Sequence, residues 1–169
     1  MSIDHQHSLE ALAADVGRLL RTTGQRLATA ESCTGGWVGQ CLTAVAGSSV
    51  WFERGFITYS NAAKNELLDV THETLASRGA VSEATAAEMA QGALRHSHAD
   101  WALAITGIAG PTGGSPGRPV GTVCFAWAAT DGRTITETRH FDGDRQSIRA
   151  QAVAHALRGV VQHAAHFAA

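Results

Sequence analysis

The 169-residue sequence lacks an excess of charge of either sign, because 13 lysine and arginine residues are balanced by 15 aspartate and glutamate residues, for a net charge of −2. A chain this close to neutral lacks the basic surface typical of nucleic-acid-binding proteins. It also lacks an apolar run long enough to span a bilayer. Residues 1–10 are polar, without the basic start and apolar centre of a signal peptide. We therefore expect a cytoplasmic protein with no nucleic-acid or membrane partner.

Cysteine is also scarce, and the histidines, although numerous, form no recognisable metal motif. The three cysteines, Cys33, Cys41 and Cys124, do not have the spacing of metal ligands and are predicted to be free thiols in a reducing compartment. None of the nine histidines falls in an H-E-x-x-H pattern. The sequence therefore predicts no metal site, and we expect no cofactor.

Hydrophobic residues make up 44% of the chain and charged residues 17%, which predicts one folded domain with a sizeable core. We predict strands at residues 27–30, 50–59, 100–105, 119–129 and 133–141, and helices at 8–23, 33–45, 62–69, 71–78, after Ser82 and after residue 144. Ser82 is predicted to cap the helix that follows it, which has a face of small residues. The last helix is predicted to have a core stripe of Val153, Leu157, Val160, Ala164 and Phe167. Asp131-Gly132 is typical of a hairpin, so the last two strands should be antiparallel. The prediction is a single α/β domain over residues 1–169, with 1–7 flexible. It should have three layers, α/β/α, around a mixed, mostly parallel sheet of about five strands.

The stretch Ala30–Gly36 places Ser32 at a predicted junction between a strand and a helix. Such a turn exposes a hydroxyl at the sheet edge and directs N–H groups of the first helical turn towards its ligand. Gly35 and Gly36 would let a ligand approach the backbone closely. The alternative is that a hydroxyl of this stretch only caps the helix. Beside the candidate nucleophile Ser32, we predict substrate contacts from Thr34, Gly35 and Gly36.

A second junction follows the predicted strand 50–59. Tyr59 ends this strand, Asn61 is predicted to cap the next helix, and Lys64 lies on the same side of its first turn. These side chains are candidates for proton transfer (Tyr59, Lys64) and substrate binding (Asn61). The alternative is a solvated lysine and an asparagine that only caps the helix.

A glycine-rich loop, residues 106–117, follows the apolar strand 100–105. Loops of this kind can surround a phosphate or a flat ring with backbone N–H groups. Thr106 at the strand end is a candidate catalytic residue, and Gly107 and Gly110 are candidate substrate contacts. The alternative is a flexible surface loop.

Ligands of open α/β sheets bind at the carboxyl ends of the strands, where Ser32, Tyr59 and Thr106 are all predicted to lie. No histidine lies near them in sequence, so the proton acceptor for Ser32 would be Lys64 or Tyr59. Backbone N–H groups near Gly35 and Gly36 would hold the oxyanion. Cys33 is a rival nucleophile, but no basic residue near it in sequence would lower its pKa. The residues alone predict a hydrolase that acts by acyl transfer on an anionic ligand.

Arg145 and Arg149 fall in the first turns of the last predicted helix, where cations oppose the helix dipole. Either Asp142 and Asp144 compensate their charge or a phosphate binds there. We take Arg145 as a candidate phosphate ligand.

Several motifs resemble the CinA C-terminal domain family, which includes nicotinamide-nucleotide amidases, over about residues 10–165. They are, in order, Ala30–Gly36, Gly55–Asn61 with Lys64, Gly79–Ser82, Ile105–Pro111, Pro119–Val123 and Gly143–Arg145.

The resemblance implies hydrolysis of the carboxamide of nicotinamide mononucleotide to nicotinate mononucleotide and ammonia, without a metal. It implies site residues at Ser32, Tyr59 and Thr106, with Lys64 and Arg145 as helpers and the glycine-rich segments around the nucleotide. The alternative is a nucleotide- or partner-binding module without turnover. Helix faces made of small residues are compatible with a homodimer.

Overall fold

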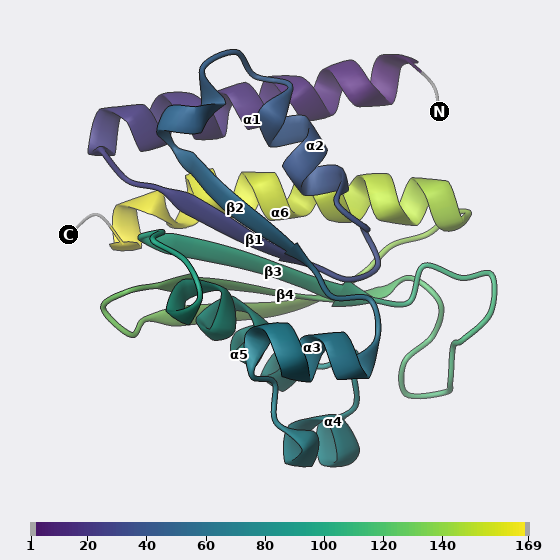
Figure 1. Ribbon diagram of the computed structural model, residues 1–169. Helices are drawn as coiled ribbons and strands as arrows, with labels where there is room; N and C mark the ends of the chain where they lie inside the picture. Colours follow the sequence, from purple (N-terminus) through teal and green to yellow (C-terminus); the bar gives the residue numbers. More distant parts are fainter. Residues whose placement is uncertain (1–2, 168–169) are drawn as a thin grey trace.

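The computed structural model describes the backbone of residues 3–167 and the side chains of residues 5–164. A single five-stranded sheet lies at its centre, with helices on both faces (Figure 1). The elements are α1 (Ile3–Thr23), β1 (Leu27–Glu31), α2 (Trp37–Thr43), the 3₁₀ helix η1 (Ser48–Val50), β2 (Phe52–Ile57), α3 (Asn61–Leu68), α4 (His72–Arg78), α5 (Glu83–Arg95), β3 (Trp101–Gly107), β4 (Thr122–Ala129), β5 (Thr134–His140) and α6 (Arg145–Phe167).

The strand order is β2-β1-β3-β4-β5. Strand β1 is parallel to both its neighbours, whereas β4 is antiparallel to both β3 and β5. The sheet is therefore mixed, with β4 running against the other four strands, and the predicted antiparallel pair is confirmed. Because β1, β2 and β3 point the same way, their carboxyl ends lie together at one edge.

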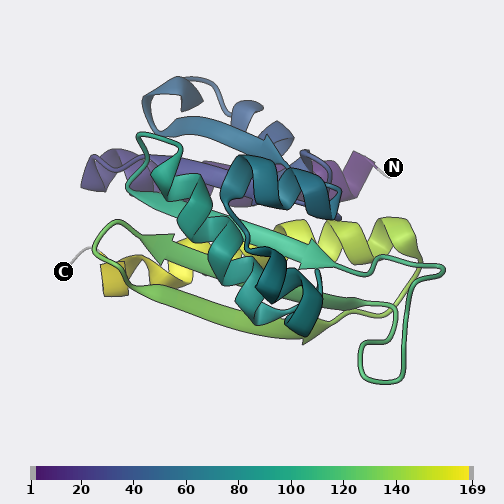
Figure 2. The same cartoon turned by 60° about the horizontal axis from the view of Figure 1, so that its bottom comes forward.

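The two faces of the sheet are packed differently. Helices α1, α2 and α6 cover one face and α5 covers the other (Figures 1 and 2). The first layer buries large side chains such as Trp51, Trp101 and Trp127, whereas the second consists mainly of alanines. The small-residue face predicted for α5 is confirmed, since Ala86 and Ala90 are fully buried. Small side chains let α5 approach the sheet closely, and α3 and α4 lie beside α5 on the same side (Figure 2).

Several predicted boundaries were wrong. Helix α1 begins at Ile3 rather than at residue 8, so residues 3–7 belong to it. Strand β2 covers Phe52–Ile57 rather than the predicted residues 50–59, and η1 lies just before it. Strand β4 starts at Thr122 rather than at residue 119. In the core stripe predicted for α6, Val153, Leu157, Val160 and Ala164 are buried, and the Phe167 side chain lies outside the described residues.

The predicted cap of α3 was also wrong. Ser60, not Asn61, is its N-cap, and the Ser60 hydroxyl accepts a hydrogen bond from the Ala63 N–H at 3.0 Å. Serine and asparagine are both good caps, so their one-residue offset could not be resolved from the sequence. The prediction that Ser82 caps α5 is confirmed.

Candidate active site

A cavity of about 170 Å³ opens at the edge where β1, β2 and β3 end. The structure brings together five of the predicted site residues with Arg145 from the start of α6. The lining residues are Ser32, Cys33, Tyr59, Lys64, Ala80, Val81, Thr106, Gly107, Ala109 and Arg145.

Ser32 and Lys64 form the closest pair of reactive groups in this cavity. The Lys64 Nζ lies 2.9 Å from the Ser32 Oγ. Ser32 directly follows β1, and its N–H donates to the Ile105 carbonyl of β3 at 3.0 Å, which fixes the residue to the sheet. Lys64 lies in the first turns of α3, whose start is fixed by the Ser60 cap. The two side chains therefore come from rigid elements.

Lys64 is 1% exposed, although lysine side chains are ordinarily solvated. Besides Ser32, its Nζ contacts the carbonyl oxygens of Thr58 and Tyr59 at 2.9 Å and 3.4 Å. All three partners are uncharged. Burial therefore lowers the pKa of the Lys64 ammonium, because removal from water disfavours its charged form.

These contacts also orient the amine. A neutral lysine has two N–H donors and one lone pair, and the Thr58 and Tyr59 carbonyls can each take one donor. The lone pair is then left to accept the hydroxyl proton of Ser32. This is the arrangement that a serine nucleophile with a lysine base requires.

Cys33, the rival nucleophile, is unsuited to the role. Burial raises the pKa of its thiol to about 12, and the nearby Arg149 opposes this shift without cancelling it. The thiolate is the reactive form of cysteine, and a thiol with this pKa stays protonated near neutral pH. Ser32 is therefore the better candidate.

Thr106 at the end of β3 is also buried, and its hydroxyl donates to the Ala80 carbonyl at 2.7 Å. This bond ties β3 to the segment between α4 and α5. Because a hydroxyl also has two acceptor lone pairs, the Thr106 oxygen can still accept a hydrogen bond from a ligand.

The rim of the cavity is formed by Tyr59 and Arg145. Tyr59 is 64% exposed, and its hydroxyl accepts a hydrogen bond from the Arg145 Nη2 at 3.1 Å. The Arg145 Nη1 donates to the Gly110 carbonyl at 2.8 Å. Arg145 thus joins the tyrosine to the glycine-rich loop, and no ion pair between Arg145 and Asp142 or Asp144 occurs among the described residues.

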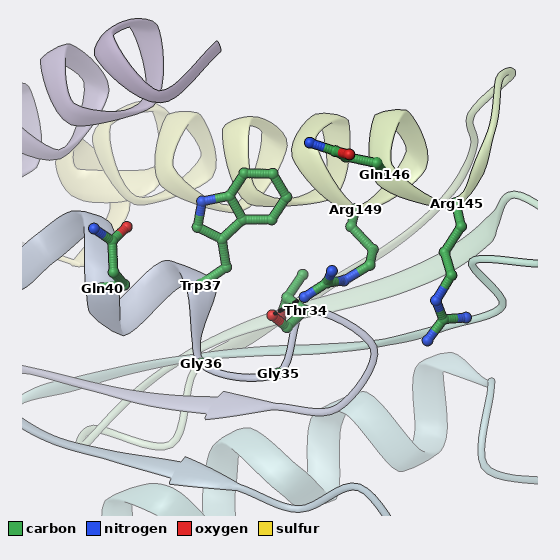
Figure 3. A pocket seen from close by; sticks show the side chains of 8 residues that line it. All are labelled: Thr34, Gly35, Gly36, Trp37, Gln40, Arg145, Gln146 and Arg149. Carbon is green, nitrogen blue, oxygen red and sulfur yellow. Dashed lines mark hydrogen bonds between the residues drawn. The ribbon is translucent and has the colours of Figure 1, made fainter. Parts of the chain in front are cut away.

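A second, larger hollow of about 500 Å³ lies beside the cavity and shares Arg145 with it. Figure 3 shows Arg149 extending from α6 to the turn of Thr34, Gly35 and Gly36, whereas Arg145 extends from the start of α6 to one side of this turn. The three substrate contacts predicted in this turn therefore lie in this second hollow rather than in the cavity.

The predicted use of the first-turn N–H groups of α2 was wrong. The buried Glu31 side chain accepts hydrogen bonds from the N–H groups of Val38 and Gly39 at 2.9 Å and 3.1 Å. The Gly35 N–H donates to the Ser32 carbonyl at 3.0 Å, which competes with the oxyanion role predicted for it. Gly36, not a hydroxyl residue, is the N-cap of α2, so the alternative that Ser32 or Thr34 caps this helix was also wrong.

One predicted site residue lies away from the cavity, and two residues that hold the Ser32 turn were not predicted to do so. Asn61 is exposed and lines a separate hollow beside His72, so the structure does not bring it to the cavity. Glu31 was missed because its role depends on the turn between β1 and α2. The sequence pattern places Arg149 in the last helix but does not connect it with the Ser32 turn, which lies more than a hundred residues away in the sequence.

Within the described part of the chain, no three His, Cys, Asp or Glu side chains gather closely enough to hold a metal ion. The helices of the same part include none that is both long and apolar enough to cross a membrane. The described cysteines form no disulfide, as predicted.

Comparison with known proteins assigns the class. Residues 9–164 match the CinA C-terminal domain family, and the chain belongs to this family. The solved competence damage-inducible protein A of Klebsiella pneumoniae is 44% identical, with a TM-score of 0.90 over 94% of this chain and 98% of that one. This likeness confirms the predicted α/β fold.

Two similar relatives carry a more specific name. Nicotinamide-nucleotide amidohydrolase PncC of Escherichia coli K12 is 54% identical over 154 residues, which cover 91% of this chain and 93% of the relative. The protein of the same name from Pseudomonas putida is 47% identical over 155 residues, which cover 91% and 96%.

Proposed function

We propose that this protein hydrolyses the carboxamide of nicotinamide mononucleotide to nicotinate mononucleotide and ammonia, with Ser32 as nucleophile and Lys64 as base. The observation that carries the proposal is the 2.9 Å contact between the Ser32 hydroxyl and a lysine that has only uncharged partners. The names of relatives about half identical over nearly their whole length support the choice of substrate.

In the first half of the reaction, the Ser32 Oγ attacks the carboxamide carbon while its proton passes to the Lys64 Nζ. The tetrahedral intermediate then collapses, and the lysine ammonium returns this proton to the leaving amide nitrogen. Ammonia departs, and the acyl group remains as an ester on Ser32. A lysine whose pKa is lowered by burial suits both steps, because more of it is the neutral amine that accepts the proton and its ammonium is a stronger acid when it gives the proton back.

In the second half, a water molecule attacks the ester carbon and gives its proton to Lys64. Collapse of the second intermediate breaks the bond to the Ser32 Oγ, which takes the proton back. The product is a carboxylic acid, which loses its proton to water and leaves as the carboxylate, and the enzyme returns to its starting state. In both halves Lys64 takes the proton of the attacking oxygen and gives it to the leaving atom, so these proton transfers need no metal ion and no cofactor.

The positions of the other groups suggest how the substrate lies. The cavity, at about 170 Å³, is smaller than most pockets for whole ligands, so we place only the pyridine carboxamide in it. The Thr106 oxygen is positioned to accept an amide N–H. The ribose phosphate would extend past the rim into the second hollow, where Arg145 has guanidinium N–H groups left for a phosphate oxygen.

The experiment that tests the proposal is ammonia release by the purified protein from nicotinamide mononucleotide, with a chelator present throughout. We expect wild-type protein to release ammonia and to form nicotinate mononucleotide, and Ser32→Ala to release none. If wild-type protein binds the nucleotide by calorimetry without releasing ammonia, the proposal fails and the chain is a binding module. If it neither binds nor releases, the assigned substrate is wrong.

A further inference from the structure

Three contacts of Arg149 fall on the segment that carries Ser32. Its Nε donates to the Cys33 carbonyl at 2.9 Å, and its Nη2 donates to the Thr34 carbonyl at 3.0 Å. The guanidinium also lies over the Trp37 ring, 5.4 Å from the ring centre. Arg149 lies on α6, so these contacts join the Ser32 turn to a helix from the far end of the chain (Figure 3).

The same turn is held from its other side by an opposite charge. The buried Glu31 carboxylate accepts from the N–H groups of Val38 and Gly39. A cation therefore binds the carbonyls of the turn and an anion binds the N–H groups that follow it. Charge-assisted bonds of this kind are stronger than neutral ones, so together they restrict the turn more than ordinary loop contacts would.

The bonds to the Cys33 and Thr34 carbonyls also determine where the neighbouring N–H groups of the Ser32 turn point. In a trans peptide the C=O of one residue and the N–H of the next point in opposite directions. By holding the Cys33 and Thr34 carbonyls, Arg149 also fixes the direction of the N–H groups of Thr34 and Gly35. The Gly35 N–H accordingly reaches the Ser32 carbonyl at 3.0 Å. Arg149 thus fixes the backbone conformation of the turn that carries the Ser32 hydroxyl.

We propose that Arg149 is a positioning residue that holds the Ser32 turn in its reactive conformation and is not a phosphate ligand. This inference rests on the proposed function of Ser32. It separates the two arginines in the first turns of α6, since Arg145 reaches the cavity rim whereas two Arg149 nitrogens are bound to backbone carbonyls. Loss of Arg149 should slow the acyl transfer step and leave nucleotide binding nearly unchanged.

The test is Arg149→Ala, with Arg158→Ala as the matched control, because Arg158 is an exposed arginine of the same helix and lines a different groove. We expect kcat for nicotinamide mononucleotide to fall about 10- to 100-fold in Arg149→Ala, the size of effect caused by small misplacement of a reacting group. KM should change less than about threefold, and millimolar guanidinium should restore part of kcat. A large rise in KM with kcat unchanged would overturn the proposal in favour of phosphate binding.

A second readout does not depend on the substrate. Amide hydrogen exchange of the peptide covering residues 32–39 should be faster in Arg149→Ala, whereas exchange in β3 and β4 should match that of wild type. If exchange in the turn is unchanged, the positioning role is wrong even when activity falls. If wild-type protein releases no ammonia, the proposed function fails, and hydrogen exchange still decides whether Arg149 holds the turn.

Discussion

The floor and the rim of the cavity differ in how deeply their side chains are buried. The floor consists of Ser32, Lys64 and Thr106, which are 7%, 1% and 1% exposed and are bound to the ends of strands. The rim residues Tyr59 and Arg145 are both exposed. We infer that the floor carries out proton transfer, which needs exclusion of water, and that the rim recognises the ribose phosphate, which must enter from solvent.

The largest effect is expected at the floor. Lys64→Met preserves the length of the side chain and removes the base, so kcat should fall at least about 1,000-fold. Because Ser32 and Lys64 act as one unit, the double variant with Ser32→Ala should be no slower than the worse single variant. Steady-state ammonia release from all three variants measures this. Additive losses would mean that the two residues act independently.

The rim should govern affinity for the phosphate. Arg145→Ala should lower kcat/KM for nicotinamide mononucleotide about 10- to 100-fold, as expected for loss of hydrogen bonds to a charged group. The loss for nicotinamide riboside, which differs by the phosphate alone, should be less than about threefold. Arg158→Ala serves as the control for both substrates. Equal losses for the two substrates would remove the phosphate role and weaken the contrast between rim and floor.

The burial of Lys64 should also appear in the pH dependence of stability. Burial lowers its pKa in the folded state below the ordinary value of 10.5, so the folded protein binds fewer protons than the unfolded chain between these two pKa values. In this window the free energy of unfolding should rise with pH by up to about 1.4 kcal/mol per pH unit relative to Lys64→Met. Below the window the difference should be constant. Urea unfolding of both proteins across the alkaline range measures it, and parallel curves would contradict a lowered pKa.

The smallest effect is expected at Asn61, which the structure places outside the cavity. Asn61→Ala should change kcat/KM by less than about twofold, since exposed residues away from a site contribute little. Ammonia release checks this as well. A tenfold loss would mean that the substrate extends along α3 and that the rim is larger than we describe.

The sequence was most informative about the site residues at the ends of the strands. Because the carboxyl ends of parallel strands meet at one edge, Ser32, Tyr59 and Thr106 could be placed together from the positions of three strands, and the structure does bring them together. The mixed sheet followed from the hairpin at residues 131–132 and is confirmed. These inferences needed only local patterns and one general rule of topology.

The contacts that fix the turn could not be predicted in the same way. Arg149 is 116 residues from Cys33, and no local pattern specifies which backbone carbonyls a distant guanidinium will bind. Glu31 resembles any carboxylate at a strand end until the direction of α2 is known. The homodimer and the cytoplasmic location remain predictions.

The most direct test of the account is to trap the acyl group on Ser32. Reactions of wild-type protein with nicotinamide mononucleotide would be quenched during the first turnover and digested for peptide mass spectrometry, with ammonia measured in the same samples. The account predicts a burst of ammonia together with the nicotinate-nucleotide ester on the peptide that contains Ser32, both absent in Ser32→Ala. Ammonia release at the wild-type rate by Ser32→Ala, with no modified peptide, would contradict it.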